Sequence, residues 1–110
     1  IEIEWVDANE EGHMSVRLGG GGGPLLQIDA LGKVAPVFQV DLFGTRTSSS
    51  HTVRDNFTMF RRMLWHFCRS VRTGEPPFDP RETVTAMRIL MAGERSIIEK
   101  RRVYLEEVHV

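Results

Sequence analysis

The amino-acid sequence predicts an α+β fold, in which a mostly antiparallel β-sheet carries two amphipathic helices packed on one face. Apolar and polar residues alternate in the first half of the chain, which is the pattern of strands with one buried face. In two later segments the apolar residues recur every three or four positions, as they do along an amphipathic helix. The order of strands, helix, helix and strand favours antiparallel pairing, because each helix must bury its apolar stripe against another layer.

The chain opens with a predicted hairpin. Ile1, Ile3 and Trp5 alternate with glutamates in a first strand, IEIEWV. The segment DANEEG supplies turn-forming residues, and HMSVRL, residues 13–18, follows as a second strand. The run from Gly19 to Gly23 ends the hairpin. We expect this run to be a mobile loop, because glycine has the greatest backbone freedom.

Two further strands are predicted before the helices. They are LLQID, residues 25–29, and VFQVDLF, residues 37–43, and the second has the alternation typical of a half-buried strand. The segment GTRTSSSHTVRD, residues 44–55, is polar and rich in turn-forming residues. It is predicted to be a loop.

The first predicted helix follows that loop. Asp55 or Asn56 can cap its beginning, and Gly74, followed by two prolines, is expected to end it. Its apolar stripe repeats at helical spacing and consists of Phe60, Met63, Leu64, Phe67, Cys68 and Val71.

The second predicted helix has the strongest local start signal in the chain. Asp79 can accept hydrogen bonds from unpaired N–H groups, Pro80 fits the first helical position, and Glu82 lies three residues after the cap. The helix is expected to run to about Lys100. Its predicted apolar face consists of Val84, Met87, Leu90, Met91, Ile97 and Ile98. The segment RVYLEEV, residues 102–108, is predicted to be a closing strand.

Length and composition indicate one domain, residues 1–110, whose 41% hydrophobic content can supply a core. Cys68 is the only cysteine, which excludes a disulfide framework and favours a reducing, cytoplasmic location. The 14 basic and 15 acidic residues give a net charge of −1, which argues against nucleic acid or an anionic membrane as a partner. Neither a membrane-spanning run nor a signal peptide is visible. Because Ile1 lies directly in a strand pattern, we expect an upstream segment to be missing.

Motifs for a nucleotide site, a metal site and a catalytic triad are all incomplete. The glycine run lacks the Gly-x-Gly-x-x-Gly spacing, and the Gly32-Lys33 pair lacks the following Ser or Thr of a Walker loop. The four histidines have no ligand partner at suitable spacing. Ser48 to Ser50, His51 and Asp55 could form a Ser-His-acid set, but without a Gly-x-Ser-x-Gly elbow a polar loop is favoured. We therefore assign no catalytic, cofactor-binding or metal-binding residue.

One face of the first predicted helix is basic. Arg61, Arg62, Arg69 and Arg72 fall within about 100° of one another on a helical wheel, and Trp65 lies among them. Such a face could bind phosphate or a nucleic-acid strand, since arginine pairs with phosphate and tryptophan stacks on bases. A solvated face whose arginines pair with nearby carboxylates is the favoured interpretation for a nearly neutral chain. The large ring of Trp65 nevertheless indicates a possible interface with another domain or subunit.

Glu94 lies in the middle of the predicted apolar face of the second helix. An unpaired ionised carboxylate is too costly to bury, so we expect it to pair with an Arg or Lys of the sheet. The alternative is that Glu94 faces a missing domain or a substrate cleft and belongs to an interface.

The later part of the chain combines a strand ending in FGTRT, a helix FRRMLWHFCRSVRTGEPPF, a capped helix closing with AGERSI, and RVYLEEV. In this order residues 37–108 resemble the carboxy-terminal region of the Gfo/Idh/MocA oxidoreductases. The matching positions are Gly44, Thr45 and Arg46 in the turn, Phe60, Leu64 and Phe67 in the helix, Arg72, Gly74 and Pro77 at its end, and Ser96 in the last helix. The departures are Thr47 in place of a second Gly, and Lys100-Arg101 in place of a final Gly.

The resemblance implies an NAD(P)-dependent sugar or polyol dehydrogenase whose amino-terminal Rossmann domain, absent here, binds NAD or NADP. This chain would shape the substrate pocket and pair subunits as a homo-oligomer, through the sheet face that the helices leave free. The family's Glu-Lys-Pro motif and catalytic His match no segment here, so the chain alone is expected to bind no cofactor and to be inactive. The alternative is a stand-alone protein-interaction or dimerisation module without enzyme activity.

Overall fold

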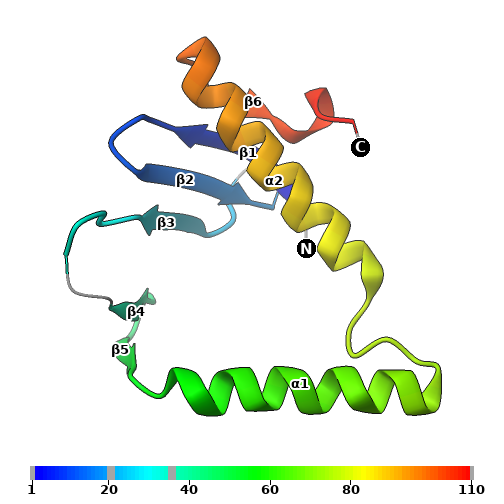
Figure 1. The fold of residues 1–110 in the computed structure, drawn as a ribbon. Helices are drawn as coiled ribbons and strands as arrows, with labels where there is room; N and C mark the ends of the chain where they lie inside the picture. The colour runs from blue at the N-terminus through cyan, green and yellow to red at the C-terminus, as the bar shows by residue number, and fades with distance from the viewer. Residues whose placement is uncertain (1, 20–21, 35–36, 110) are drawn as a thin grey trace. The chain divides into compact units, whose positions relative to one another are not determined.

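The computed structural model describes residues 2–19, 22–34 and 37–109 (Figure 1). Antiparallel strands and two helices confirm the predicted α+β class. The chain divides into two compact units, one formed by the residues up to Gly32 together with those from Asp79 onward, and one formed by Lys33–Phe78. The elements in chain order are β1 (Ile3–Ala8), β2 (His13–Leu18), β3 (Leu25–Asp29), β4 (Phe38–Phe43), β5 (Ser48–Val53), α1 (Asn56–Thr73), α2 (Pro80–Glu99), β6 (Val103–Tyr104) and the 3₁₀ helix η1 (Leu105–Glu107).

The first unit contains a four-stranded antiparallel sheet with the strand order β3-β2-β1-β6. The predicted β1–β2 hairpin is confirmed, and β3 has the predicted bounds. The strict alternation predicted for β1 is wrong, because the register shifts between Ile3, opposite Leu18, and Trp5, opposite Arg17. This irregularity puts Ile3 in the core with Val6, whereas Trp5 points to the other face. The predicted mobile glycine loop includes Gly20 and Gly21, which lie outside the described residues.

Helix α2 packs on this sheet through its small residues. Ala92, Gly93 and Ser96 are its buried positions, and they lie against the fully buried side chains of Val6 and Val16. A Cβ atom added to Gly93 would lie 3.1 Å from the Met14 sulfur and 3.9 Å from a Val6 methyl group. The helix therefore approaches the strands closely because Gly93 has no side chain.

The predicted limits of α2 are confirmed, but its predicted buried face is wrong. Asp79 caps the helix by accepting from the Arg81 amide, Pro80 occupies the first turn, and Lys100 ends the helix in the left-handed conformation with φ of 54°. The face toward the sheet is the narrow one with small residues, as described above. The exposed large side chains of α2 are those of Val84, Met87, Leu90, Met91 and Ile98.

The closing strand is shorter than predicted, because RVYLEEV forms only the two-residue β6 before the chain turns into η1. Glu107 accounts for the turn: its carboxylate accepts from the Tyr104 amide and from Arg101, both at 2.8 Å. The Arg101 guanidinium and the Tyr104 amide together lower the pKa of Glu107 to about 2. The buried positions of this segment are Val103, Leu105 and Val108.

The second unit contains the hairpin β4–β5 and helix α1. The prediction of a loop over residues 44–55 is wrong, because Ser48–Val53 pairs with β4 in an antiparallel ladder that runs from Phe38 opposite Val53 to Phe43 opposite Ser48. The Gly44 amide donates to the Thr47 carbonyl at 2.9 Å and closes the turn. Both faces of this hairpin are exposed, so β5 can consist largely of serine and threonine without burying an apolar face. Its sequence therefore lacks the alternation of apolar and polar residues by which a strand is predicted.

Helix α1 begins and ends as predicted. Asp55 accepts from the Thr58 amide at 2.9 Å, and Gly74 takes the left-handed conformation, with φ of 76°. None of its residues is buried, and none of the described residues 33–34 and 37–78 of this unit is buried either. The apolar stripe of α1 is therefore uncovered by its own unit.

The hydroxyl of Ser96 should be a measurable source of stability. It is fully buried, accepts from the Ala8 amide at 2.9 Å and donates to the Arg101 carbonyl at 2.7 Å. Ser96→Ala leaves the Ala8 amide without this partner, so we expect urea titration to show a loss of about 1–3 kcal/mol in the free energy of unfolding. The matched control is Ser15→Ala, whose hydroxyl bonds the exposed Gln27 side chain, with a change within about 0.5 kcal/mol. Equal effects would contradict the role of Ser96.

Candidate functional site

Among the described residues, neither a metal-binding group nor a hydrogen-bonded Ser-His-acid set is seen. No group of three or more His, Cys, Asp and Glu side chains in residues 2–19, 22–34 and 37–109 could hold a metal ion. Of the Ser-His-acid set considered above, Ser50 donates to Asp41, whereas Asp55 accepts from both the amide and the hydroxyl of Thr58 at the start of α1. In this part of the chain, no helix is both long and apolar enough to cross a membrane. The surfaces of the two units are therefore the candidates for function.

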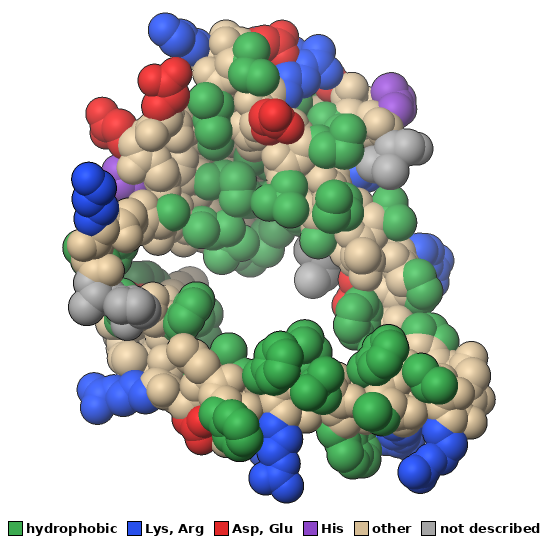
Figure 2. Space-filling model, viewed as in Figure 1, with side chains coloured by type: hydrophobic (Ala, Val, Ile, Leu, Met, Phe, Trp, Pro, Cys, Tyr) green, Lys and Arg blue, Asp and Glu red, His purple; other side chains and the backbone are tan. Residues whose placement is uncertain are grey.

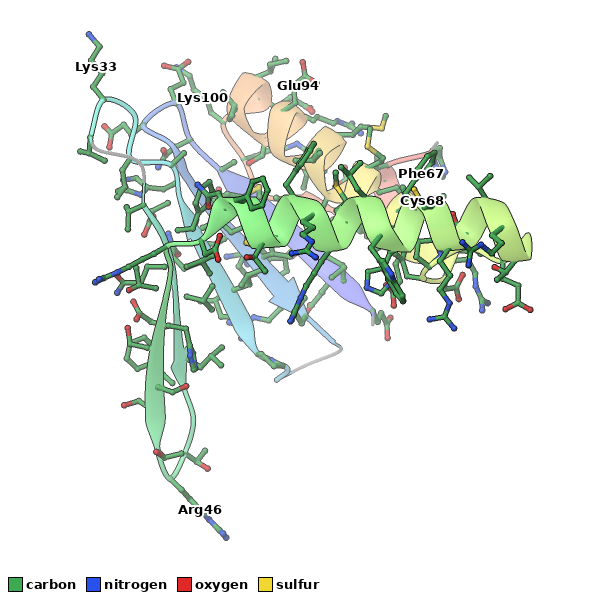
Figure 3. The ribbon with its side chains drawn as sticks, turned by 60° about the horizontal axis from the view of Figure 1, so that its bottom comes forward. Lys33, Arg46, Phe67, Cys68, Glu94 and Lys100 are labelled. Carbon is green, nitrogen blue, oxygen red and sulfur yellow. The ribbon has the colours of Figure 1, made fainter. Side chains whose placement is uncertain are left out.

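The first candidate surface is the apolar stripe of α1, which we call the α1 stripe and define as Phe60, Met63, Leu64, Phe67 and Val71. All five side chains are exposed, and Phe67 retains 62% of its accessible surface. Figure 2 shows hydrophobic side chains gathered along α1, and Figure 3 shows Phe67 and Cys68 on this helix. Phe67 and Met63 also line a shallow groove with the segment Pro77–Phe78. Contiguous exposed apolar surface of this kind marks an interaction site or an aggregation-prone face.

The basic face of α1 is exposed, as its sequence predicts. The guanidinium carbon of Arg69 lies 5.5 Å from the centre of the Trp65 ring, in reach of a cation–π contact, and the His66 ring meets Trp65 edge-on. In the described part of the chain, the ion pairs do not include Arg61, Arg62, Arg69 or Arg72. The pairing with nearby carboxylates that the sequence favoured is thus not seen in this geometry.

Glu94 belongs to a third surface, the outward face of α2. The expectation that it is buried against a basic side chain is wrong, because Glu94 is exposed. It lines a shallow hollow with Met91, Arg95 and Ile98 of α2, of which Ile98 is 72% exposed. Glu107, Val108 and His109 complete the lining. An exposed carboxylate beside the exposed apolar side chains of Met91 and Ile98 is the arrangement that the interface alternative predicts, although Arg95, Glu107 and His109 also line the hollow.

The sequence predicted a free sheet face for subunit pairing but did not identify the residues that lie on the face opposite α2. Trp5 is only 8% exposed, because the guanidinium carbon of Arg102 lies 3.7 Å and that of Arg17 lies 5.7 Å from the centre of its ring. Tyr104 pairs with Trp5 across β1 and β6, so it lies on the same face. The face therefore combines aromatic rings with arginines. Its residues depend on the shift of register after Ile3. The alternation of residue types in the sequence does not indicate this shift.

A polar network crosses β2 and β3 on the same face. The Nδ1 atom of His13 lies 2.6 Å from Asp29 Oδ1, Gln27 Nε2 donates to the same oxygen at 3.2 Å, and Ser15 donates to Gln27 at 2.8 Å. The hydrogen bond with Asp29 raises the pKa of His13, and the bond with His13 lowers the pKa of Asp29. The stabilisation by this pair is lost as the pH rises through the raised pKa of His13, and as it falls through the lowered pKa of Asp29. It is fully present between the ordinary values of 3.8 for Asp and 6.5 for His.

Comparison with models of protein families, with curated proteins and with solved structures found no match to this chain. The resemblance to the Gfo/Idh/MocA oxidoreductases therefore depends on its motif residues alone. Several of these occupy defined positions. Arg46 lies at the tip of the β4–β5 hairpin (Figure 3), Gly74 ends α1, and Ser96 is a buried residue of α2.

The pair of His13 and Asp29 can be tested by proton NMR titration of the imidazole. We expect His13 to titrate above its ordinary value of 6.5, because the carboxylate stabilises the protonated ring. In Asp29→Asn this partner is neutral, so the His13 titration should move down toward 6.5. Ser15→Ala, which leaves Asp29 in place, is the control and should leave the His13 titration near its wild-type midpoint. A His13 midpoint that does not respond to Asp29→Asn would show that the pair is not formed in solution.

Proposed function

We propose that this chain is a binding and assembly domain, the substrate-side and subunit-pairing part of an NAD(P)-dependent sugar or polyol dehydrogenase related to the Gfo/Idh/MocA oxidoreductases. It performs no catalysis alone. In the complete enzyme a Rossmann domain binds NAD or NADP and supplies the catalytic residues, while this chain closes the substrate pocket.

The observation that carries the proposal is the uncovered α1 stripe. An isolated domain that functions alone buries the apolar face of an 18-residue helix, because that burial is the main source of helix stability in proteins. Here the α1 stripe is exposed, and so are the large apolar side chains around Glu94 on α2. An apolar helix face that its own unit leaves uncovered is available for contact with another domain or subunit.

Subunit pairing is supported by the character of the free sheet face. It is not wholly charged, since Trp5 and Tyr104 lie beside Arg17 and Arg102. Aromatic residues and arginine are the residue types enriched at the centres of protein interfaces, and a free sheet face can pair with its own copy across a two-fold axis. We propose this face as the contact between subunits in a homo-oligomer.

The second candidate is a stand-alone interaction or dimerisation module without enzyme activity. The observation that favours it is the exposed pair of Trp65 and Arg69 on the basic face of α1, next to Arg61, Arg62 and Arg72. Tryptophan and arginine are frequent hot-spot residues in protein interfaces. This candidate uses the basic face of α1 rather than the α1 stripe, and it requires no Rossmann domain.

We predict that the chain alone binds neither NAD nor NADP. Binding of a dinucleotide pyrophosphate needs glycine-rich backbone N–H groups at the start of a helix, and both α1 and α2 begin with an aspartate cap whose carboxylate occupies those groups. Isothermal titration calorimetry should give no heat of binding at cofactor concentrations up to the millimolar range. A micromolar dissociation constant for either cofactor would contradict the proposal.

The two candidates differ in the protein that surrounds the chain. A longer transcript of the same gene, read in the same frame, separates them. A Gly-x-Gly-x-x-Gly segment between a strand and a helix, with a Glu-Lys-Pro segment after it, supports the dehydrogenase. A full-length product without these segments contradicts the dehydrogenase and supports the stand-alone module.

A further inference from the structure

The four-stranded sheet of the first unit has two unequal edges. At one edge β6 has only two residues and the chain then turns into η1, so little backbone is open to pairing. At the other edge β3 is a five-residue strand whose residues are all exposed. Between its end residues it contains neither a charge nor a proline, the features with which proteins usually protect an edge strand.

The direction of the unpaired backbone groups of β3 follows from its ladder with β2. The Leu18 amide donates to the Pro24 carbonyl at 3.0 Å, and the Ala30 amide donates to the Gly12 carbonyl at 2.8 Å. Bonded residues alternate along an antiparallel strand, so the even-numbered residues of β3 direct their amides and carbonyls toward β2. The residues whose backbone groups point away from the sheet are Leu25, Gln27 and Asp29.

We propose that β3 pairs in antiparallel orientation with β3 of a second copy of this chain, about a two-fold axis at Gln27, and joins the two four-stranded sheets into one. This register is self-complementary. It places Gln27 opposite Gln27 of the second copy and Leu25 opposite Asp29, and all three carry outward amides and carbonyls that can bond in pairs. A shift by one residue would set outward groups against inward ones.

The side chains fit the same register. Leu26 and Ile28 point to the face of the sheet on which α2 packs, since they pair with Val16 and Met14 of the core face. They are 45% and 41% exposed, and in the proposed register each lies opposite the other, so the pair buries apolar surface on both copies. On the opposite face the Asp29 carboxylate is already paired with His13, so it brings little uncompensated charge to the edge.

This inference does not rest on the proposed function. Face pairing uses the side chains of Trp5 and Tyr104, whereas edge pairing uses the backbone of β3. The hairpin β4–β5 also has open edges, but its unit contributes no buried residue among those described that would hold its strands in place. The β3 edge belongs to a sheet anchored by the fully buried Val6 and Val16.

The test is sedimentation velocity of the full chain over a range of concentrations, with Gln27→Pro and Gln27→Thr. Both variants lose the Gln27 side-chain bonds to Ser15 and Asp29, but only proline removes the outward amide, and an edge strand tolerates proline at such a position. We expect a monomer–dimer equilibrium whose dissociation constant rises at least about tenfold in Gln27→Pro, and by less than about threefold in Gln27→Thr.

Amide hydrogen exchange in the same samples identifies the surface directly. The Leu25, Gln27 and Asp29 amides should become protected as the protein concentration rises, while a protected Val6 amide in Gln27→Pro shows that the sheet is still folded. A monomer at every concentration overturns the proposal. So does a dimer whose dissociation constant in Gln27→Pro is the same as in Gln27→Thr. If Gln27→Pro does not fold, the wild-type exchange decides: a Gln27 amide whose protection is independent of concentration overturns the proposal.

Discussion

The close approach of α2 to the β1–β2 hairpin is the contact on which the first unit depends. Small residues on the helix, Ala92, Gly93 and Ser96, allow it to lie directly on Val6 and Val16. Dense packing of this kind gains dispersion and hydrophobic free energy only where both surfaces fit. The Ser96 hydroxyl accepts a hydrogen bond from the Ala8 amide, which satisfies this backbone group at the contact. Sheet register, helix orientation and the position of the C-terminal segment all follow from it.

The same contact determines which surfaces are left for function. Because the small face of α2 is turned to the sheet, its large apolar residues are exposed, and Met91 and Ile98 line a shallow hollow with Glu94. The opposite face of the sheet carries Trp5 between two arginines, and the second unit exposes the whole α1 stripe. The small residues of α2 are used for packing on the sheet, and its large apolar residues are left exposed. Exposed apolar surface of this kind favours contact with another domain or subunit.

The sequence predicted much of the fold and less of the surface. Strand and helix limits followed from alternation and caps, as with Asp79 and Gly74, since these signals are local. The buried face of α2 could not be predicted in this way. A helical wheel assigns burial to the large apolar residues, whereas here the helix lies so close to the sheet that Gly93 faces it. The same holds for the register shift at Ile3 and for the strand β5, whose polar residues lack alternation. Each of these depends on a neighbour distant in sequence, which no local pattern reports.

The central claim is that the well-packed core lies under α2 in the first unit, whereas the second unit by itself leaves the α1 stripe uncovered and holds α1 only weakly. Native-state amide hydrogen exchange tests this claim most directly, because it resolves the free energy of opening along the sequence. The account predicts that amides of β1 and of the second half of α2 exchange only through global unfolding, and that amides of α1 exchange at a much lower free energy of opening. Protection of α1 equal to that of β1 would contradict it, since α1 would then be held as firmly as the core under α2.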